Sequence, residues 1–170
     1  FFGGEPLMNW DVVKKLVEYA RSIEKENGKN YKAEVINLDG QWEMGRFGFS
    51  FYENSDGTPL YFTEAADVPG IVEGMGDCIA YKTTVELQGL SFSDHVFITT
   101  PRSFCDQKIF INGQLAGEVK ASLYDNELDV TGFVSAGVNE LLILVKCGGT
   151  GDAFAAKGLH GSVKITVTGG

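Results

Sequence analysis

The stretch Ile109-Phe110-Ile111-Asn112-Gly113-Gln114-Leu115 carries the clearest structural signal in the chain. Asn-Gly is a preferred pair for a two-residue type I′ turn, because both positions need a positive φ and the turn then matches the twist of the paired strands. The β-branched and aromatic residues before the turn are typical of a strand. The stretch therefore predicts a β-hairpin whose turn lies at residues 112–113.

Short segments with a period of two continue on both sides of this hairpin. Turn-forming pairs such as Asp39-Gly40, Asp56-Gly57 and Pro69-Gly70 separate them. Many short strands with turns between them are typical of a sandwich or barrel rather than of alternating strands and helices. We predict a mainly β protein in which residues 31–168 form an antiparallel β-sandwich, a jelly roll. The expected strands cover residues 32–38, 41–52, 59–63, 79–88, 93–100, 107–112, 115–119, 127–131, 140–147 and 161–168.

Residues 9–27 show the one clear helical pattern. Asn9 can cap the first turn, and Gly28 supplies a left-handed stop after the last. Such a helix is marginal on its own, so we expect its apolar side to dock on a face or edge of the sandwich. The chain thus divides into a helical segment, residues 1–30, and a sandwich, residues 31–168. The apolar residues that recur at helical spacing are Val12, Val13, Leu16, Val17, Ala20 and Ile23.

Charge divides the chain near the same place. The 170 residues carry a net charge of −9. Residues 1–38 hold six acidic and six basic residues, so the remaining 17 acidic and 8 basic residues account for the whole imbalance. A nucleic-acid-binding surface needs clustered Lys and Arg, and the sequence shows no such cluster. No apolar run approaches the roughly 20 residues of a membrane span, so we expect neither a nucleic-acid nor a membrane partner.

Metal-binding patterns are few. Cys78, Cys105 and Cys147 lie 27 and 42 residues apart, too far for the close spacing of zinc or iron–sulfur ligands. They allow either one disulfide with a free thiol or three reduced, buried thiols. The segment at residues 54–57, Asn-Ser-Asp-Gly, carries oxygen donors suited to a structural calcium ion, although Asp-Gly also fits a simple turn.

Six motifs of the predicted sandwich occur in the order that one known family uses. They are I-N-L-D-G-Q-W at 36–42, D-V-P-G at 67–70, Y-K-T-T-V-E-L at 81–87, I-F-I-N-G-Q-L-A-G-E at 109–118, L-D-V-T-G-F-V at 128–134 followed by G-V-N-E-L at 137–141, and G-L-H-G-S-V at 158–163. Together they resemble the N-terminal sugar-binding domain of family 2 glycoside hydrolases, a galactose-binding-domain-like jelly roll.

The resemblance implies a non-catalytic role. In that family the catalytic acid and nucleophile lie on a (β/α)₈ barrel, which needs roughly 250 residues. The resemblance implies a module that binds an oligo- or polysaccharide, or an accessory domain packed beside a glycoside hydrolase catalytic domain. The alternative is a structural or interaction sandwich with no ligand of its own. A glycan-binding role favours an extracellular or periplasmic location. Glu64, Glu73, Glu86, Glu118 and Glu127 are candidate catalytic carboxylates by residue type alone.

Residues 1–30 resemble a different family. Phe1-Phe2-Gly3-Gly4-Glu5-Pro6 and the helix after it are similar to the G-G-E-P segment of radical S-adenosylmethionine enzymes of the sulfatase-maturase type. In that family the backbone of this segment contacts the amino group of the cofactor. The C-x₃-C-x₂-C motif that holds the iron–sulfur cluster there does not occur in this sequence. We therefore expect a fused or leftover piece without radical chemistry, with a fragment of such an enzyme as the less favoured alternative.

A carbohydrate site needs an aromatic side chain to stack on the sugar and planar polar groups to bind its hydroxyls. Tyr124, Asp125 and Asn126 supply this combination just before the strand expected at 127–131, and Arg102 lies in the connection at 100–106. We predict that these four residues contact the ligand from one rim of the sandwich. The Asp-Asn pair also fits an ordinary turn. Trp42, within a strand motif, is expected in the core.

Overall fold

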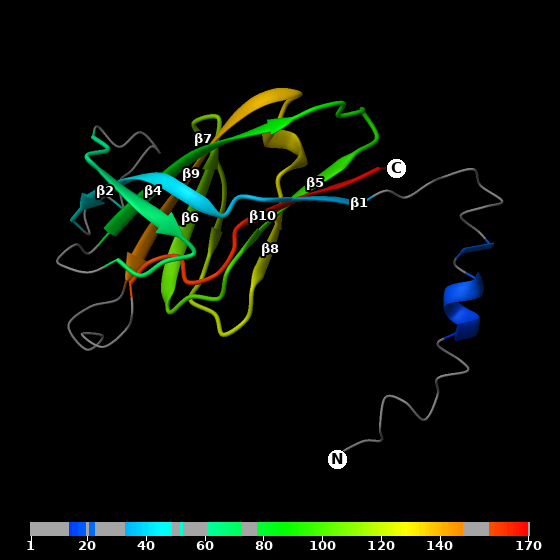
Figure 1. Cartoon of the computed structure of the whole chain (residues 1–170), viewed down its shortest axis with the longest axis horizontal. Helices are drawn as coiled ribbons and strands as arrows, with labels where there is room; N and C mark the ends of the chain where they lie inside the picture. The colour runs from blue at the N-terminus through cyan, green and yellow to red at the C-terminus, as the bar shows by residue number, and fades with distance from the viewer. Residues whose placement is uncertain are drawn as a thin grey trace, which may run out of the picture.

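The computed structural model describes residues 14–19, 21, 22, 33–48, 52, 61–72, 78–147 and 157–169. Within these ranges the chain forms two antiparallel sheets that pack face to face (Figure 1), with strand orders β1-β10-β5-β8 and β3-β2-β4-β9-β6-β7. The predicted antiparallel β-sandwich is confirmed. The strands are β1 (Ala33–Asn37), β2 (Gly40–Phe47), β3 (Glu64–Val68), β4 (Cys78–Leu87), β5 (His95–Thr100), β6 (Cys105–Ile111), β7 (Gln114–Val119), β8 (Asn126–Asp129), β9 (Gly137–Cys147) and β10 (Lys164–Thr168), with a 3₁₀ turn at Thr131–Phe133.

The predicted hairpin joins β6 to β7. Ile111 pairs with Gln114, and the two residues between them, Asn112 and Gly113, have φ values of 52° and 77°. Two successive residues with positive φ are what a type I′ turn requires, so the local Asn-Gly signal is confirmed.

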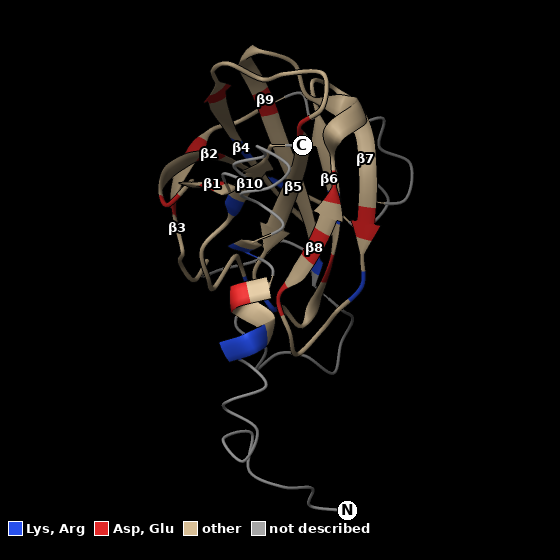
Figure 2. Ribbon diagram, turned by 90° about the vertical axis from the view of Figure 1, so that its right-hand side faces the viewer, with Lys and Arg blue, Asp and Glu red and all other residues tan. Residues whose placement is uncertain are grey.

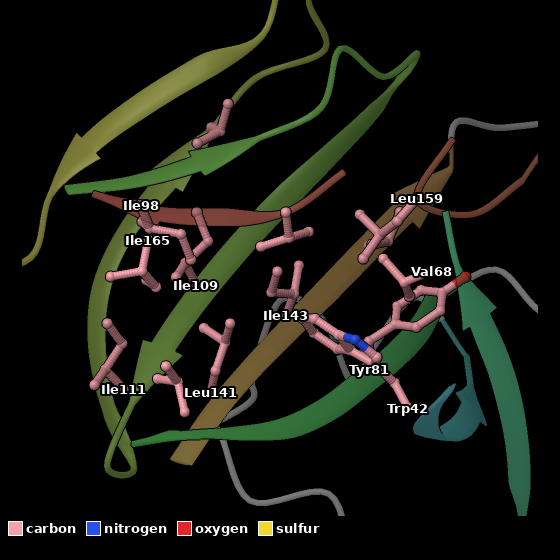
Figure 3. Packing of buried hydrophobic residues seen from close by; sticks show 14 of the residues in the cluster. Trp42, Val68, Tyr81, Ile98, Ile109, Ile111, Leu141, Ile143, Leu159 and Ile165 are labelled. Carbon is pink, nitrogen blue, oxygen red and sulfur yellow. The ribbon is translucent and has the colours of Figure 1, made fainter. Parts of the chain in front are cut away.

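Apolar side chains from both sheets fill the space between them (Figure 3). Ile98 of β5 and Ile165 of β10 come from the smaller sheet, and Ile109 and Ile143 come from the larger one. Trp42 belongs to this core, as predicted, and its indole N–H donates to the carbonyl of Leu38 at 2.8 Å. Each such buried side chain contributes about 1.5–3 kcal/mol through removal from water.

The six-stranded sheet is buried on its other face too. Tyr52 packs there in a second cluster with Cys78, Ala80, Phe110, Leu142 and Leu144. The buried ammonium of Lys108 donates to the carbonyl of Tyr52 at 2.7 Å and lies 4.7 Å from the centre of its ring. Burial on both faces explains why β4 and β9 contain continuous apolar runs rather than strict alternation.

A buried amide fastens the hairpin turn to the beginning of β9. Asn139 is 1% exposed, and its Oδ1 accepts hydrogen bonds from the Ser135 amide at 2.8 Å and from Asn112 Nδ2 at 2.9 Å. Its own Nδ2 donates to the carbonyls of Ser135 at 2.8 Å and Gly137 at 3.0 Å. These four bonds use the full hydrogen-bonding capacity of the Asn139 amide.

The chain is helical at residues 14–19 and 21–22, inside the helix predicted at 9–27, whose expected ends lie outside the described residues. All described side chains of this helix are exposed, including Leu16 at 61% and Val17 at 45%, and the helix stands apart from both sheets (Figure 1). The expected docking of its apolar side is therefore wrong for these residues, because helical periodicity shows an apolar face but not whether a surface meets it. Within the described ranges no helix has the length and apolar character to cross a membrane.

The cysteines follow the first of the two alternatives. Cys105 is disulfide-bonded, whereas Cys78 is a free, fully buried thiol on β4. Burial raises the pKa of Cys78 to about 12, although the nearby Lys108 and Lys146 oppose the shift. Burial likewise raises the pKa of the Tyr81 hydroxyl, also on β4, to about 12.

These two raised pKa values predict that the fold loses stability in alkali. Above pH 9 for Cys78 and pH 10 for Tyr81, the unfolded chain releases a proton that the folded chain keeps until about pH 12. The free energy of unfolding should therefore fall between these limits, by up to about 1.4 kcal/mol per pH unit for each group. Urea unfolding at several pH values measures the slope. Tyr81→Phe should flatten it above pH 10, and an unchanged slope in that variant would contradict the assignment to Tyr81.

Candidate functional site

Two connections meet at one end of the sandwich and form a rim, defined here as residues 101–104 between β5 and β6 and residues 120–125 between β7 and β8. Ser103 and Ser122 join the connections as an antiparallel bridge, with backbone N···O distances of 3.1 and 2.8 Å. The backbone of the rim is thus held by hydrogen bonds between segments distant in the sequence. A ligand that binds side chains of the rim therefore orders little additional backbone, which reduces the entropy lost on binding.

The structure brings together the four residues that the sequence predicts for this rim. Asp125 Oδ1 accepts the backbone N–H of Arg102 at 3.0 Å, which links the two connections a second time. Asn126 begins β8 opposite Thr100, and its Nδ2 donates to the carbonyl of Tyr124 at 3.4 Å. The Tyr124 ring itself is 80% exposed. Asp125 therefore links the two connections through the hydrogen bond to its Oδ1. The Tyr124 side chain is accessible to a ligand.

Two apolar residues of the rim were missed at the sequence level. Phe104 is 68% exposed and Leu123 is 66% exposed, which is unusual for side chains of their size. With Tyr124 they give the rim three large exposed apolar side chains on two linked connections. The sequence did not indicate that Phe104 and Leu123 are exposed, because an apolar residue next to a strand is equally compatible with a place in the core.

Acidic residues lie on β7 and β8, whose ends lead into the rim (Figure 2). Asp106, next to the rim, accepts hydrogen bonds from the Ala121 amide at 3.0 Å and from the Lys120 ammonium at 3.1 Å. Burial opposes its ionisation, but these two donors outweigh that effect and lower the pKa of Asp106. The Asp106 carboxylate thus fixes residues 120 and 121, which follow β7, through these two hydrogen bonds.

The candidate catalytic carboxylates are spread over several strands. Glu64 lies on β3 and Glu118 on β7, at opposite edges of the six-stranded sheet, and Glu127 lies on the other sheet. Glu86, on β4, accepts a hydrogen bond from Gln88 at 3.2 Å, and Glu73 lies outside the described residues. Glycosidase chemistry needs two carboxyl groups about 5–10 Å apart across one bond. The strand positions of the described candidates do not by themselves identify such a pair.

A concave surface, which we call the β2–β3 hollow, lies where β2 and β3 meet the turn at residues 69–72. Its volume is about 470 Å³. Arg46 of β2 and Glu64 of β3 form a two-pronged ion pair in its wall, with Nε···Oε1 and Nη2···Oε2 distances of 2.8 and 3.2 Å. The hydrogen bonds between them lower the pKa of Glu64 and raise that of Arg46, so both groups are charged near neutral pH. The hollow is lined by Met44, Arg46, Glu64, Ala65, Ala66, Asp67, Pro69, Gly70, Ile71 and Val72.

The sequence did not indicate this hollow, because its ion pair joins residues 18 positions apart on neighbouring strands. The calcium candidate at 54–57 lies outside the described residues. Among the residues that are described, no group of three or more His, Cys, Asp or Glu side chains is placed to hold a metal ion.

The fold is shared with domains of known enzymes. A β-glucuronidase from an uncultured Clostridium sp. matches 81% of this chain with a TM-score of 0.66 and 18% identity. The β-glucuronidase of Bifidobacterium dentium, solved with coumarin-3-O-glucuronide, matches 81% with a TM-score of 0.67 and 16% identity, and that of Faecalibacterium prausnitzii matches 83% with a TM-score of 0.66 and 17% identity. The matched parts are 29%, 30% and 32% of those chains.

No model of a known protein family matches this chain, and no curated protein matches its sequence. The resemblance of residues 1–30 to radical S-adenosylmethionine enzymes gains no support from these comparisons. At identities below 20% the likeness concerns the fold. The chain spans about a third or less of these β-glucuronidases, and it has the fold of one β-sandwich domain within them.

Proposed function

We propose that this chain is a non-catalytic accessory module of a glycoside hydrolase and that it recognises an oligo- or polysaccharide through Tyr124, Asp125, Asn126 and Arg102. The observation that carries the proposal is the Tyr124 ring, 80% exposed on a connection that is tied to its neighbour by Asp125. An aromatic ring held in this way can stack on the C–H face of a sugar. The amide of Asn126 and the guanidinium of Arg102 belong to the same linked segments and can bind hydroxyls.

The fold supports the accessory part of this proposal. The sandwich corresponds to about 30% of the β-glucuronidases, which leaves the rest of those chains without a counterpart here. We infer that the partner of this module is the catalytic domain of such a hydrolase, and that it works where glycans are met, outside the cytoplasm. A structural calcium ion at residues 54–57 remains part of the proposal.

The second candidate function is a sandwich that contacts another protein and has no ligand of its own. The exposed Phe104 and Leu123 on the same two connections favour it, because large exposed apolar side chains are typical of protein contacts as well as of glycan sites. In the first function Tyr124 contacts a sugar, and in the second it contacts another protein. Binding of isolated oligosaccharides therefore separates them.

Tyr124→Ala should weaken carbohydrate binding. Isothermal titration of the whole chain with a panel of plant and mucin oligosaccharides should give a saturable heat for at least one glycan. Loss of the stacking ring should weaken that binding about tenfold, equivalent to about 1.4 kcal/mol. Phe92→Ala is the matched control, because Phe92 is a fully exposed aromatic residue in the turn before β5, and it should bind like the wild type.

A silent panel would favour the protein-contact function instead. Equal loss in Tyr124→Ala and Phe92→Ala would also count against the rim as the site. Repeating a positive titration in EDTA tests the calcium ion, because binding that is lost in EDTA and restored by Ca²⁺ would support it.

A further inference from the structure

The β2–β3 hollow is built from two chemically different walls. One wall is the ion pair of Arg46 with Glu64, whose side chains are partly buried at 27% and 43% exposure. The other wall is apolar, with the buried Met44 and Val72 and the exposed Ile71. A ligand that fills the hollow must therefore present polar groups on one side and C–H groups on the other.

The backbone that encloses the hollow is held by hydrogen bonds. The Gly70 amide donates to the carbonyl of Leu159 at 2.8 Å, and the Val72 amide donates to the carbonyl of Lys157 at 2.9 Å. These bonds fix the turn at residues 69–72 against the segment that leads into β10. The hollow thus exists before any ligand arrives, which reduces the entropy lost on binding.

The polar wall suits hydroxyl groups better than a charged ligand. Arg46 directs two donors at Glu64, and a carboxylate has about four acceptor sites, so Glu64 can accept further hydrogen bonds. An anionic ligand would have to compete with Glu64 for the guanidinium and would meet Asp67, which also lines the hollow. A cavity of about 470 Å³ lies in the range of small-ligand sites and is too small for a long polymer segment.

We propose that the β2–β3 hollow is a second carbohydrate subsite, which takes one uncharged pyranose residue with a hydroxyl on Glu64 of the ion pair and its C–H face against the exposed Ile71. This site is separate from the rim and does not depend on the function proposed for it. A pyranose meets the requirement set by the two walls, because its ring carries hydroxyl groups at the periphery and C–H groups on its faces.

The test is a titration of the isotope-labelled whole chain, followed by amide NMR, with methyl β-D-glucopyranoside, methyl β-D-galactopyranoside and methyl α-D-mannopyranoside. At least one of these should cause saturable shifts confined to β2, β3 and residues 69–72. Glu64→Gln should weaken that binding about tenfold, through loss of a charged acceptor. Glu43→Gln is the matched control, because Glu43 is an exposed carboxylate on β2 that does not line the hollow, and it should leave the affinity unchanged.

Ile71→Ala gives an independent check that does not disturb the ion pair. Ile71 is exposed, so its truncation should leave the fold intact and weaken the sugar about threefold through lost apolar contact. Tyr124→Ala should leave binding in the hollow unchanged, which separates this subsite from the rim. The proposal is overturned if no uncharged glycoside shifts these amides, if Glu43→Gln weakens binding as much as Glu64→Gln, or if methyl β-D-glucuronide binds the hollow more tightly than the uncharged sugars.

Discussion

Asn139→Ala should lower the free energy of unfolding by about 3 kcal/mol. The substitution removes the Asn139 amide, to which the backbone N–H and C=O of Ser135 and the carbonyl of Gly137 are bonded. These three backbone groups then lose their hydrogen bonds to that side chain. It also leaves the Asn112 side-chain amide without one of its two acceptors. These hydrogen bonds are partly buried, and each is worth about 0.5–1.5 kcal/mol, so the loss of four of them supports a total of about 3 kcal/mol. Urea unfolding followed by tryptophan fluorescence measures the change.

Asn37→Ala is the matched control for Asn139→Ala. Asn37 is also a strand asparagine with a side-chain hydrogen bond, to Asp39 at 3.0 Å, but it is exposed to water. Its replacement should cost less than about 0.5–1 kcal/mol, because water can replace the lost bond. Equal losses in the two variants would show that burial of the amide network is not what stabilises the hairpin turn.

Gly158→Ala should destabilise the fold by about 3 kcal/mol for two separate reasons. The φ of Gly158 is +118°, a conformation that residues with a Cβ rarely adopt. A Cβ at this position would also lie 2.8 Å from the Gly70 carbonyl oxygen and 3.0 Å from the Tyr81 hydroxyl. The clash is with backbone, so it cannot be relieved by rotating a side chain. Thermal and urea unfolding of the variant measure the loss.

Gly132→Ala is the matched control, because it shows how much stability is lost when a glycine without a positive φ or a close contact is replaced. A Cβ at Gly132, in the 3₁₀ turn, would meet no atom within 4 Å. That variant should be neutral or slightly more stable, by up to about 1 kcal/mol, because alanine restricts the unfolded chain. If Gly158→Ala were equally harmless, the close approach of the 69–72 turn to the segment before β10 would be disproved.

The sandwich could be predicted because its signals are local. The Asn112-Gly113 turn needs only two residues in the left-handed region, and most strands show a local period of two or a continuous apolar run. The strand expected at 59–63 is wrong for the described residues 61–63, and β3 instead covers Glu64–Val68. Trp42 could be assigned to the core because it stands in a strand pattern. The helix shows the limit of the same reasoning, since the spacing of Leu16 and Val17 indicates an apolar face but names no surface that would cover it.

The two sites depend on residues that are distant in the chain. Arg102 and Asp125, 23 positions apart, meet because the connections after β5 and β7 reach the same end of the sandwich. Their positions in connections between expected strands predicted a shared rim, but the bond between them and the exposure of Phe104 follow from the packing. No local sequence pattern indicated the Arg46–Glu64 ion pair, whose partners lie 18 positions apart.

The pattern of residues was therefore sufficient to determine the mainly β class and the hairpin turn, because these depend on the φ preferences and side-chain alternation of neighbouring residues. Strand order was decided by tertiary structure. β1 pairs with β10 from Ala33↔Thr168 to Asn37↔Lys164, and no local preference encodes a contact across most of the chain. The rim and the hollow arise from these long-range pairings, since burial of both sheets in one core sets which loops meet.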